Sequence, residues 1–204
     1  MDQILLTFEK VIPSAELIVF CGSVSDPSAH SIYYRMIQTA KEKSIKTIID
    51  SRGIPLIEAL KAKPWMVKMN CEEAEETWGK KINRKEDYHN FYEFLKKSGI
   101  EYLILTFGEK GAWFRGEGIT WFGYSPKVIS INPVGSGDSF LAAFIFGLVH
   151  GKEWNECLRL GLAAGAANAQ TWDAAMVTWD DIQLLLPEVR VETGDSFFLS
   201  FKEN

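Results

Sequence analysis

A glycine-rich segment that precedes the most apolar helical stretch carries the strongest chemical signal. It reads Asn132-Pro133-Val134-Gly135-Ser136-Gly137-Asp138. Two glycines let the backbone turn so that successive N–H groups point the same way. The start of a helix then adds unpaired N–H groups and a partial positive charge. We therefore predict that this segment binds a phosphate or a developing anion.

Asp138 stands at the mouth of this predicted anion site, and two interpretations remain open for it. A carboxylate there cannot bind phosphate, but it could accept a proton from an attacking hydroxyl. The alternative is that Asp138 only caps the following helix, a position that aspartate favours.

Asn70 and Glu73 form a second polar pair, at the end of a predicted strand. Their spacing of three residues is that of a capping box, in which each side chain bonds the other residue's backbone N–H. The functional interpretation is that Glu73 holds a magnesium ion or its waters near phosphates. The two roles compete, because a carboxylate bound to its own helix is less available to water.

Short apolar strands alternate with amphipathic helices along most of the chain, a pattern that predicts the α/β class with a parallel sheet covered on both faces. The predicted strands are 17–21, 46–50, 65–69 and 102–107, a hairpin of 112–114 and 119–122, and a short strand at 128–131. The predicted helices are 1–11, 28–43, 54–62, 71–78, 86–97, 138–149, 154–169 and 179–186, and the tail 189–204 has no assignment.

Ligands of open α/β sheets bind beyond the carboxyl ends of the strands. Polar turns follow predicted strands at 22–23, 50–53, 70–73 and 106–111. The helix at 161–169 is rich in glycine and alanine, which indicates close packing or a slot for a flat ring.

Composition excludes several classes of protein. The chain has 204 residues, a formal charge of −5 and no basic cluster, so binding to nucleic acid through phosphates is not expected. Its longest apolar run, 140–149, is far shorter than a membrane span of about 20 residues. Three widely spaced cysteines and no signal-peptide pattern predict a reduced, cytoplasmic protein without a disulfide scaffold or structural zinc.

The order of these turns resembles that of the ribokinase-like (PfkB) family of sugar kinases. The resemblance rests on Gly22-Ser23, 68–73, 105–111, 132–138 and 161–168. The sequences of 132–138 and of the C-terminal 184–192 are most similar to the phosphosugar branch, which includes tagatose-6-phosphate kinases and 1-phosphofructokinases. The family implies a three-layer ribokinase-like fold with a mostly parallel sheet flanked by helices. Residues 1–204 would then be a single domain, the C-terminal nucleotide-binding and catalytic portion.

The resemblance also implies a mechanism that uses ATP and Mg²⁺. Asp138 would deprotonate a hydroxyl of a phosphorylated hexose, of the tagatose 6-phosphate or fructose 1-phosphate type, which attacks the γ-phosphate of ATP. The N–H groups of Gly135, Ser136 and Gly137 would stabilise the transferring phosphoryl group, and Asn70 and Glu73 would bind magnesium. Thr106, Gly108 and Gly111 would line the nucleotide site, and Gly165 and Asn168 would lie beside adenine. Arg52 would bind the phosphate of the substrate.

The family's chains begin with roughly another third, which supplies several strands, the lid and most sugar-binding residues. This sequence starts inside what resembles the helix before Leu17. We therefore expect residues 17–21 to lie at an open edge of the sheet, with unpaired backbone N–H and C=O groups. Such an edge is expected to cause self-association or low solubility. An alternative function is a catalytically silent nucleotide-binding fragment or assembly module, because this chain alone is expected to show weak or no kinase activity.

Overall fold

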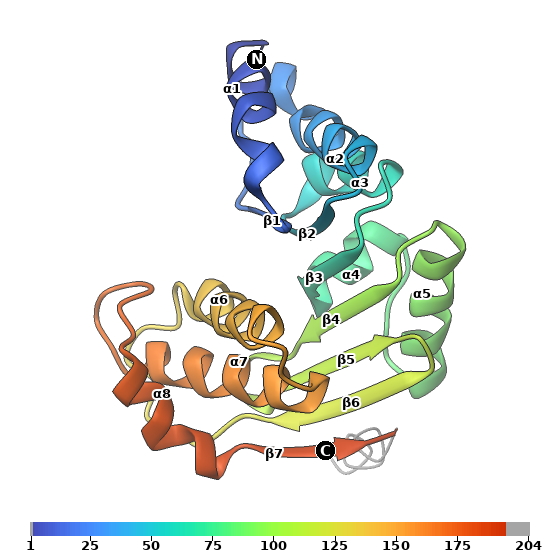
Figure 1. The fold of residues 1–204 in the computed structure, drawn as a ribbon. Coiled ribbons are helices and arrows are strands. Elements are labelled where there is room, and N and C mark those ends of the chain that lie inside the picture. The colour runs from blue at the N-terminus through green and yellow to red at the C-terminus, as the bar shows by residue number, and fades with distance from the viewer. Residues whose placement is uncertain (1, 195–204) are drawn as a thin grey trace. The chain divides into compact units, whose positions relative to one another are not determined.

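The computed structural model describes residues 2–194 (Figure 1). The chain divides into two compact units with the bounds Met1–Leu105 and Thr106–Asn204. Each unit is described by itself. That the whole chain acts as a single domain remains a prediction.

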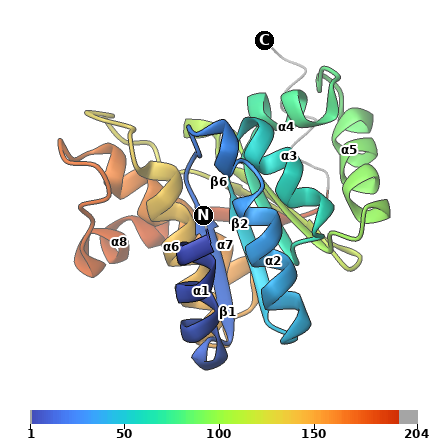
Figure 2. The ribbon, with the colours of Figure 1, turned by 90° about the horizontal axis from the view of Figure 1, so that it is seen from above.

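The first unit alternates strands and helices. Its strands follow one another in space in chain order: β1 (Leu17–Cys21), β2 (Lys46–Asp50), β3 (Met66–Asn70) and β4 (Tyr102–Thr106). Its helices are α1 (Asp2–Val11), α2 (Ile32–Glu42), α3 (Gly53–Lys61), α4 (Cys71–Trp78) and α5 (Lys85–Lys97). Figure 2 shows α1 and α2 beside β1 and β2.

Parallel pairing and burial agree with the sequence pattern of these strands. Leu17 lies opposite Lys46 and Cys21 opposite Asp50, so β1 and β2 pair in register along their whole length. The apolar residues Ile48, Ile49 and Val67 are fully buried. Continuous apolar runs of this kind are typical of parallel strands covered on both faces.

Polar side chains hold the carboxyl ends of these strands together. Lys68 Nζ lies 2.5 Å from Asp50 Oδ2, and both side chains are almost completely buried. Ser51 Oγ donates to the carbonyl oxygen of Gly22 at 2.7 Å, which ties the end of β1 to the end of β2. Tyr33 Oη donates to the same carbonyl at 3.2 Å, so the turn after β1 is fixed from two sides.

The second unit contains antiparallel strands and three helices. Its strands are β5 (Ala112–Gly116), β6 (Ile119–Tyr124) and β7 (Arg190–Thr193), which lie in that order. Its helices are α6 (Ser136–Val149), α7 (Trp154–Ala169) and α8 (Trp179–Leu185). The core is aromatic: the ring centroids of Phe114 and Trp154 are 4.8 Å apart, and those of Phe114 and Phe144 are 5.8 Å apart.

Helices α6 and α7 approach closely because α7 presents glycine to α6. A Cβ added at Gly161 would lie 3.0 Å from the carbonyl oxygen of Phe140. One added at Gly165 would lie 3.1 Å from the carbonyl oxygen of Ser136. The small-residue helix therefore serves close packing, as its composition indicates.

The predicted α/β class is confirmed, and most predicted elements agree with the structure within two residues. The strand predicted at 128–131 is wrong, because this segment has no regular structure. The N–H groups of Ile131 and Asn132 donate to the carbonyl oxygen of Ala169, at 2.6 and 3.1 Å. The segment thus follows the end of α7 instead of pairing with a strand, and Ile129 is 86% exposed.

Further expectations concern the helix at 28–43, the tail and the cysteines. The helix is divided, with a 3₁₀ turn at Pro27–Ala29 before α2. The unassigned tail contains β7, and residues 195–204 lie outside the described part. None of the three cysteines forms a disulfide. Within residues 2–194, no helix is long and apolar enough to cross a membrane.

Candidate active site

The second unit contains a cavity of about 1090 Å³. Its wall includes Thr106 at the end of β4, Gly108 and Gly111 from the turn that follows, Ser136 and Gly137 from the start of α6, and Gly165 from α7. The structure therefore brings together six of the residues predicted to bind ATP or its transferring phosphoryl group.

The turn at 106–111 offers backbone N–H groups to this cavity. The turn is closed by Phe107 N–H, which donates to the carbonyl oxygen of Gly111 at 2.9 Å, and by Gly111 N–H, which donates to Gly108 at 3.2 Å. Within the described part of the chain, the N–H groups of Gly108 and Glu109 have no acceptor. They are therefore available to an anion in the cavity.

The beginning of α6 supplies further donors. Gly135 is the N-cap residue and has a left-handed conformation, with φ of +83°. Ser136 N–H donates to the carbonyl oxygen of Pro133 at 3.1 Å, so one of the three predicted donors is already used inside the turn. The N–H groups of Gly135, Gly137 and Asp138 have no acceptor among residues 2–194. This is the arrangement that binds anions at helix N-termini.

Asp138 is not the helix cap. It is the third residue of α6, and its exposed carboxylate makes no hydrogen bond or ion pair with any described residue. The capping interpretation is therefore wrong. Asp138 lines a second, smaller cavity of about 400 Å³, which Ser139, Phe146 and Trp179 also line.

An apolar slot occupies one side of the larger cavity. Helix α7 contributes Gly165, Ala166 and Ala169 to the wall, and the irregular segment after β6 contributes Pro126 and Val128. Small residues on the helix leave room for a flat group, so the slot suits an aromatic base. A slot for a flat ring, the second interpretation of the helix at 161–169, is thus compatible with close packing, the first.

Asn168, which the resemblance places beside adenine, contacts the protein through its whole side-chain amide. Its side chain is fully buried. The amide nitrogen donates to the carbonyl oxygen of Val134 at 2.8 Å and to Ser136 Oγ at 3.0 Å. It therefore contacts the glycine-rich turn, and this burial does not support a side-chain contact with a base.

Several lining residues were not predicted as site residues from the sequence: Tyr124, Lys127, Ser130 and Arg190. Tyr124 lies opposite Arg190 in the β6–β7 pairing. The Arg190 guanidinium carbon is 4.3 Å from the centre of the Tyr124 ring, and Arg190 Nε is 3.4 Å from Glu192 Oε1. Burial, and then the charge of Glu192, raise the pKa of Tyr124, so its hydroxyl stays protonated at neutral pH.

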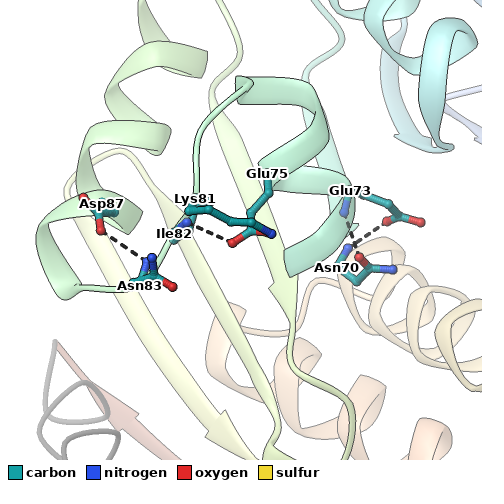
Figure 3. Close-up of polar contacts among 7 residues, drawn as sticks. All are labelled: Asn70, Glu73, Glu75, Lys81, Ile82, Asn83 and Asp87. Carbon is teal, nitrogen blue, oxygen red and sulfur yellow. Dashed lines mark hydrogen bonds and ion pairs between the residues drawn. The ribbon is translucent and has the colours of Figure 1, made fainter.

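The predicted magnesium residues lie in the first unit, where they form a capping box (Figure 3). Glu73 N–H donates to Asn70 Oδ1 at 2.9 Å, and Asn70 N–H donates to Glu73 Oε2 at 2.8 Å. The capping interpretation is confirmed. Because each carboxylate has two oxygens, Oε1 of Glu73 is still available to water, and Mg²⁺ is commonly bound through few carboxylates, waters and phosphates.

Figure 3 also shows how the segment after α4 is held. Glu75 Oε1 accepts from Ile82 N–H at 3.0 Å, and its other oxygen is 2.6 Å from Lys81 Nζ. These two contacts lower the pKa of Glu75. Arg52, the candidate for a substrate phosphate, is exposed at the start of α3 and forms no ion pair with the described residues.

Comparison with protein families matches residues 2–179 to the "pfkB family carbohydrate kinase" description. The match includes the turn at 106–111, the glycine-rich turn and the whole of α7. The chain belongs to the pfkB family of carbohydrate kinases. The resemblance inferred from the order of its motifs is therefore confirmed.

The chain is similar to proteins named as phosphofructokinases. The chain is 29% identical to 1-phosphofructokinase of Bacillus subtilis over 180 residues, 88% of this chain and 59% of that protein. It is 27% identical to 1-phosphofructokinase of Borreliella burgdorferi, over 90% of this chain and 59% of that protein. The structure of phosphofructokinase-2 from Escherichia coli in complex with potassium matches with a TM-score of 0.83 at 24% identity, over 92% of this chain and 62% of that one.

The structural match confirms the predicted ribokinase-like fold of this pfkB family member. The chain spans 59% of the length of these two 1-phosphofructokinases.

We expect Gly111→Ala to be more damaging than Gly108→Ala. Gly111 has φ of +124°, and an added Cβ would lie 1.9 Å from the backbone oxygen of Gly123. Gly108 has φ of +59° and nothing within 4 Å of an added Cβ. Gly111→Ala should lower the free energy of unfolding by more than about 2 kcal/mol, and Gly108→Ala by about 1 kcal/mol. Urea unfolding of the two variants measures the difference, and equal losses would contradict the role of the Gly111–Gly123 approach.

Proposed function

We propose that this pfkB family member binds ATP in the larger cavity and transfers its γ-phosphate to a hydroxyl of a phosphorylated sugar. The observation that carries the proposal is the composition of the cavity wall. Gly108 and Glu109, in the turn at 106–111, and Gly137, at the start of α6, have N–H groups without acceptors among the described residues, and all three line the same cavity as the small residues of α7. Phosphates and a flat base need these two environments side by side.

Asp138 is the general base in this proposal. Its carboxylate is exposed and makes no protein contact, so it can accept the proton of an acceptor hydroxyl. The hydroxyl oxygen then bonds to the γ-phosphorus, the bond to the β–γ bridging oxygen breaks, and ADP leaves. Gly135 and Gly137 donate N–H groups to the transferring phosphoryl group, where negative charge is stabilised.

Thr106, Gly108 and Gly111 would contact the nucleotide, and Gly165 would lie along its base. Asn70 and Glu73 would hold a magnesium ion through its waters, using the Glu73 oxygen outside the capping box. That ion, when bound, supplies positive charge to the phosphates. Arg52 would bind the phosphate of the sugar. The acceptor class, a tagatose 6-phosphate or fructose 1-phosphate type of sugar, is supported by the 1-phosphofructokinase relatives.

The first test is a nucleotide-dependent stability shift. ATP with magnesium at about 100 times its Kd should stabilise the chain by about 2.7 kcal/mol, measured as a rise in Tm. Ala169→Phe should abolish the shift, because Ala169 lines the slot. Ala142→Phe, on the wall of the smaller cavity, is the matched control and should retain the shift. No shift in the parent chain at millimolar ATP would contradict the proposal.

The second test concerns Asp138. Asp138→Asn should keep ATP affinity within about twofold and reduce phosphoryl transfer by about 10²-fold or more, because an amide cannot accept the proton. ADP formation with a phosphorylated hexose measures transfer, and Asp180→Asn, at an exposed position of α8, is the control. Equal transfer in Asp138→Asn and the parent would show that Asp138 is not the base. ATP binding without transfer in the parent would support the alternative, a silent nucleotide-binding module.

The edge of β1 is the basis of a third prediction, self-association. Gly22 N–H donates to the carbonyl oxygen of Asp50 at 3.0 Å. Because successive residues of a strand alternate in direction, the N–H groups of Ile18 and Phe20 also point to β2. The N–H group of Val19 therefore points to the opposite edge of β1. β2 is the only paired neighbour of β1 among the described strands. We expect the chain to self-associate through this edge and Val19→Pro to weaken association at least tenfold in sedimentation velocity. Val19→Thr, which keeps the N–H, should associate as the parent does, and a monomeric parent would contradict the prediction.

A further inference from the structure

The side chain of Asn168 uses every hydrogen-bonding position that an amide has. Its nitrogen donates to the Val134 carbonyl oxygen at 2.8 Å and to Ser136 Oγ at 3.0 Å. Its oxygen accepts from Ala175 N–H at 2.6 Å and from Ser139 Oγ at 3.4 Å. Because Val134 offers only an acceptor and Ala175 only a donor, the orientation of the amide is fixed by its partners.

These contacts set the direction of the glycine-rich turn. In a trans peptide the N–H points opposite to the carbonyl, and no described peptide is cis. The Val134 carbonyl points to Asn168, so the N–H of Gly135 points away from α7. Ser136, whose hydroxyl is held by the same amide, and Gly137, the next residue, both line the larger cavity.

The loop after α7 holds the same turn from its other side. Ala175, whose N–H is bound by Asn168, has a left-handed φ of +58°, an uncommon conformation for a residue other than glycine. A Cβ added at Gly135 would lie 2.7 Å from the nitrogen of Ala175. The turn at 133–137 is thus in close contact with both Asn168 and this loop.

We propose that Asn168 is a positioning residue for phosphate binding: its buried amide locks the 133–137 turn so that the N–H groups at the start of α6 face the phosphates of the nucleotide. The inference rests on the proposed function. It assigns Asn168 to the turn and not to the base. An amide is suited to this task, because it donates and accepts at once without bringing a charge close to the phosphates.

The experiment compares ATP with adenosine. Asn168→Asp keeps the size and the acceptor oxygens but loses at least one of the two donors to the turn. We expect its affinity for ATP to fall about tenfold or more while its affinity for adenosine changes less than twofold, both measured by titration calorimetry. A residue that only stabilised the fold would weaken both ligands together. Gln170→Glu makes the same chemical change at the exposed end of α7 and should alter neither affinity.

A second variant and two contrary outcomes complete the test. Asn168→Ser, which is smaller, uncharged and retains one donor, should show the same selective loss, and it separates the lost donor from the negative charge that aspartate adds. A parent chain that binds ATP and a folded variant that binds it equally well would overturn this inference alone. Parallel loss of ATP and adenosine binding would also overturn it. A parent chain that binds no ATP would overturn the proposed function and, with it, this inference.

Discussion

The close approach of α6 and α7 is the constraint on which the wall of the larger cavity depends. Added Cβ atoms at Gly161 and Gly165 would lie 3.0 and 3.1 Å from backbone oxygens of α6, so larger side chains would push the helices apart. With glycine at both positions, the first turn of α6 lies against α7. Only then can the amide of Asn168 reach Val134 and Ser136, and only then do both helices border one cavity.

The first turn of α6 separates the residues proposed to bind phosphate from the carboxylate proposed as the base, which would repel phosphate. Ser136 and Gly137 line the larger cavity, whereas Asp138, the next residue, lines the smaller one. Successive helical residues are rotated by about 100° about the axis, which places the carboxylate on a different side from the two residues before it. A negative side chain is thereby kept from the lining of the cavity proposed for phosphates, and it remains exposed to an incoming hydroxyl.

Polar side chains of the first unit combine a structural contact with a functional candidate. Asn70 and Glu73 close a capping box, and the oxygen of Glu73 outside this box is the group proposed for a magnesium water. Capping also limits the motion of that carboxylate, because two hydrogen bonds fix the side chains. At the ends of β2 and β3, the buried pair of Asp50 and Lys68 leads into Asn70, two residues further along β3. A structural role for Glu73 is therefore compatible with a chemical one.

The sequence by itself determined most elements and the order of the chemical turns. Apolar runs, caps and glycines are local signals, which is why β1, β2, α4 and α7 have the bounds that their patterns predict. Tertiary structure decided which residues share a cavity and where the amide of Asn168 points. Arg190 reaches the wall only through the pairing of β7 with β6. The segment 128–131 pairs with no strand, and its last N–H group, that of Ile131, donates to Ala169 at the end of α7. The partners of Asn168 extend from Val134 to Ala175, and no local pattern encodes contacts across such distances in the chain.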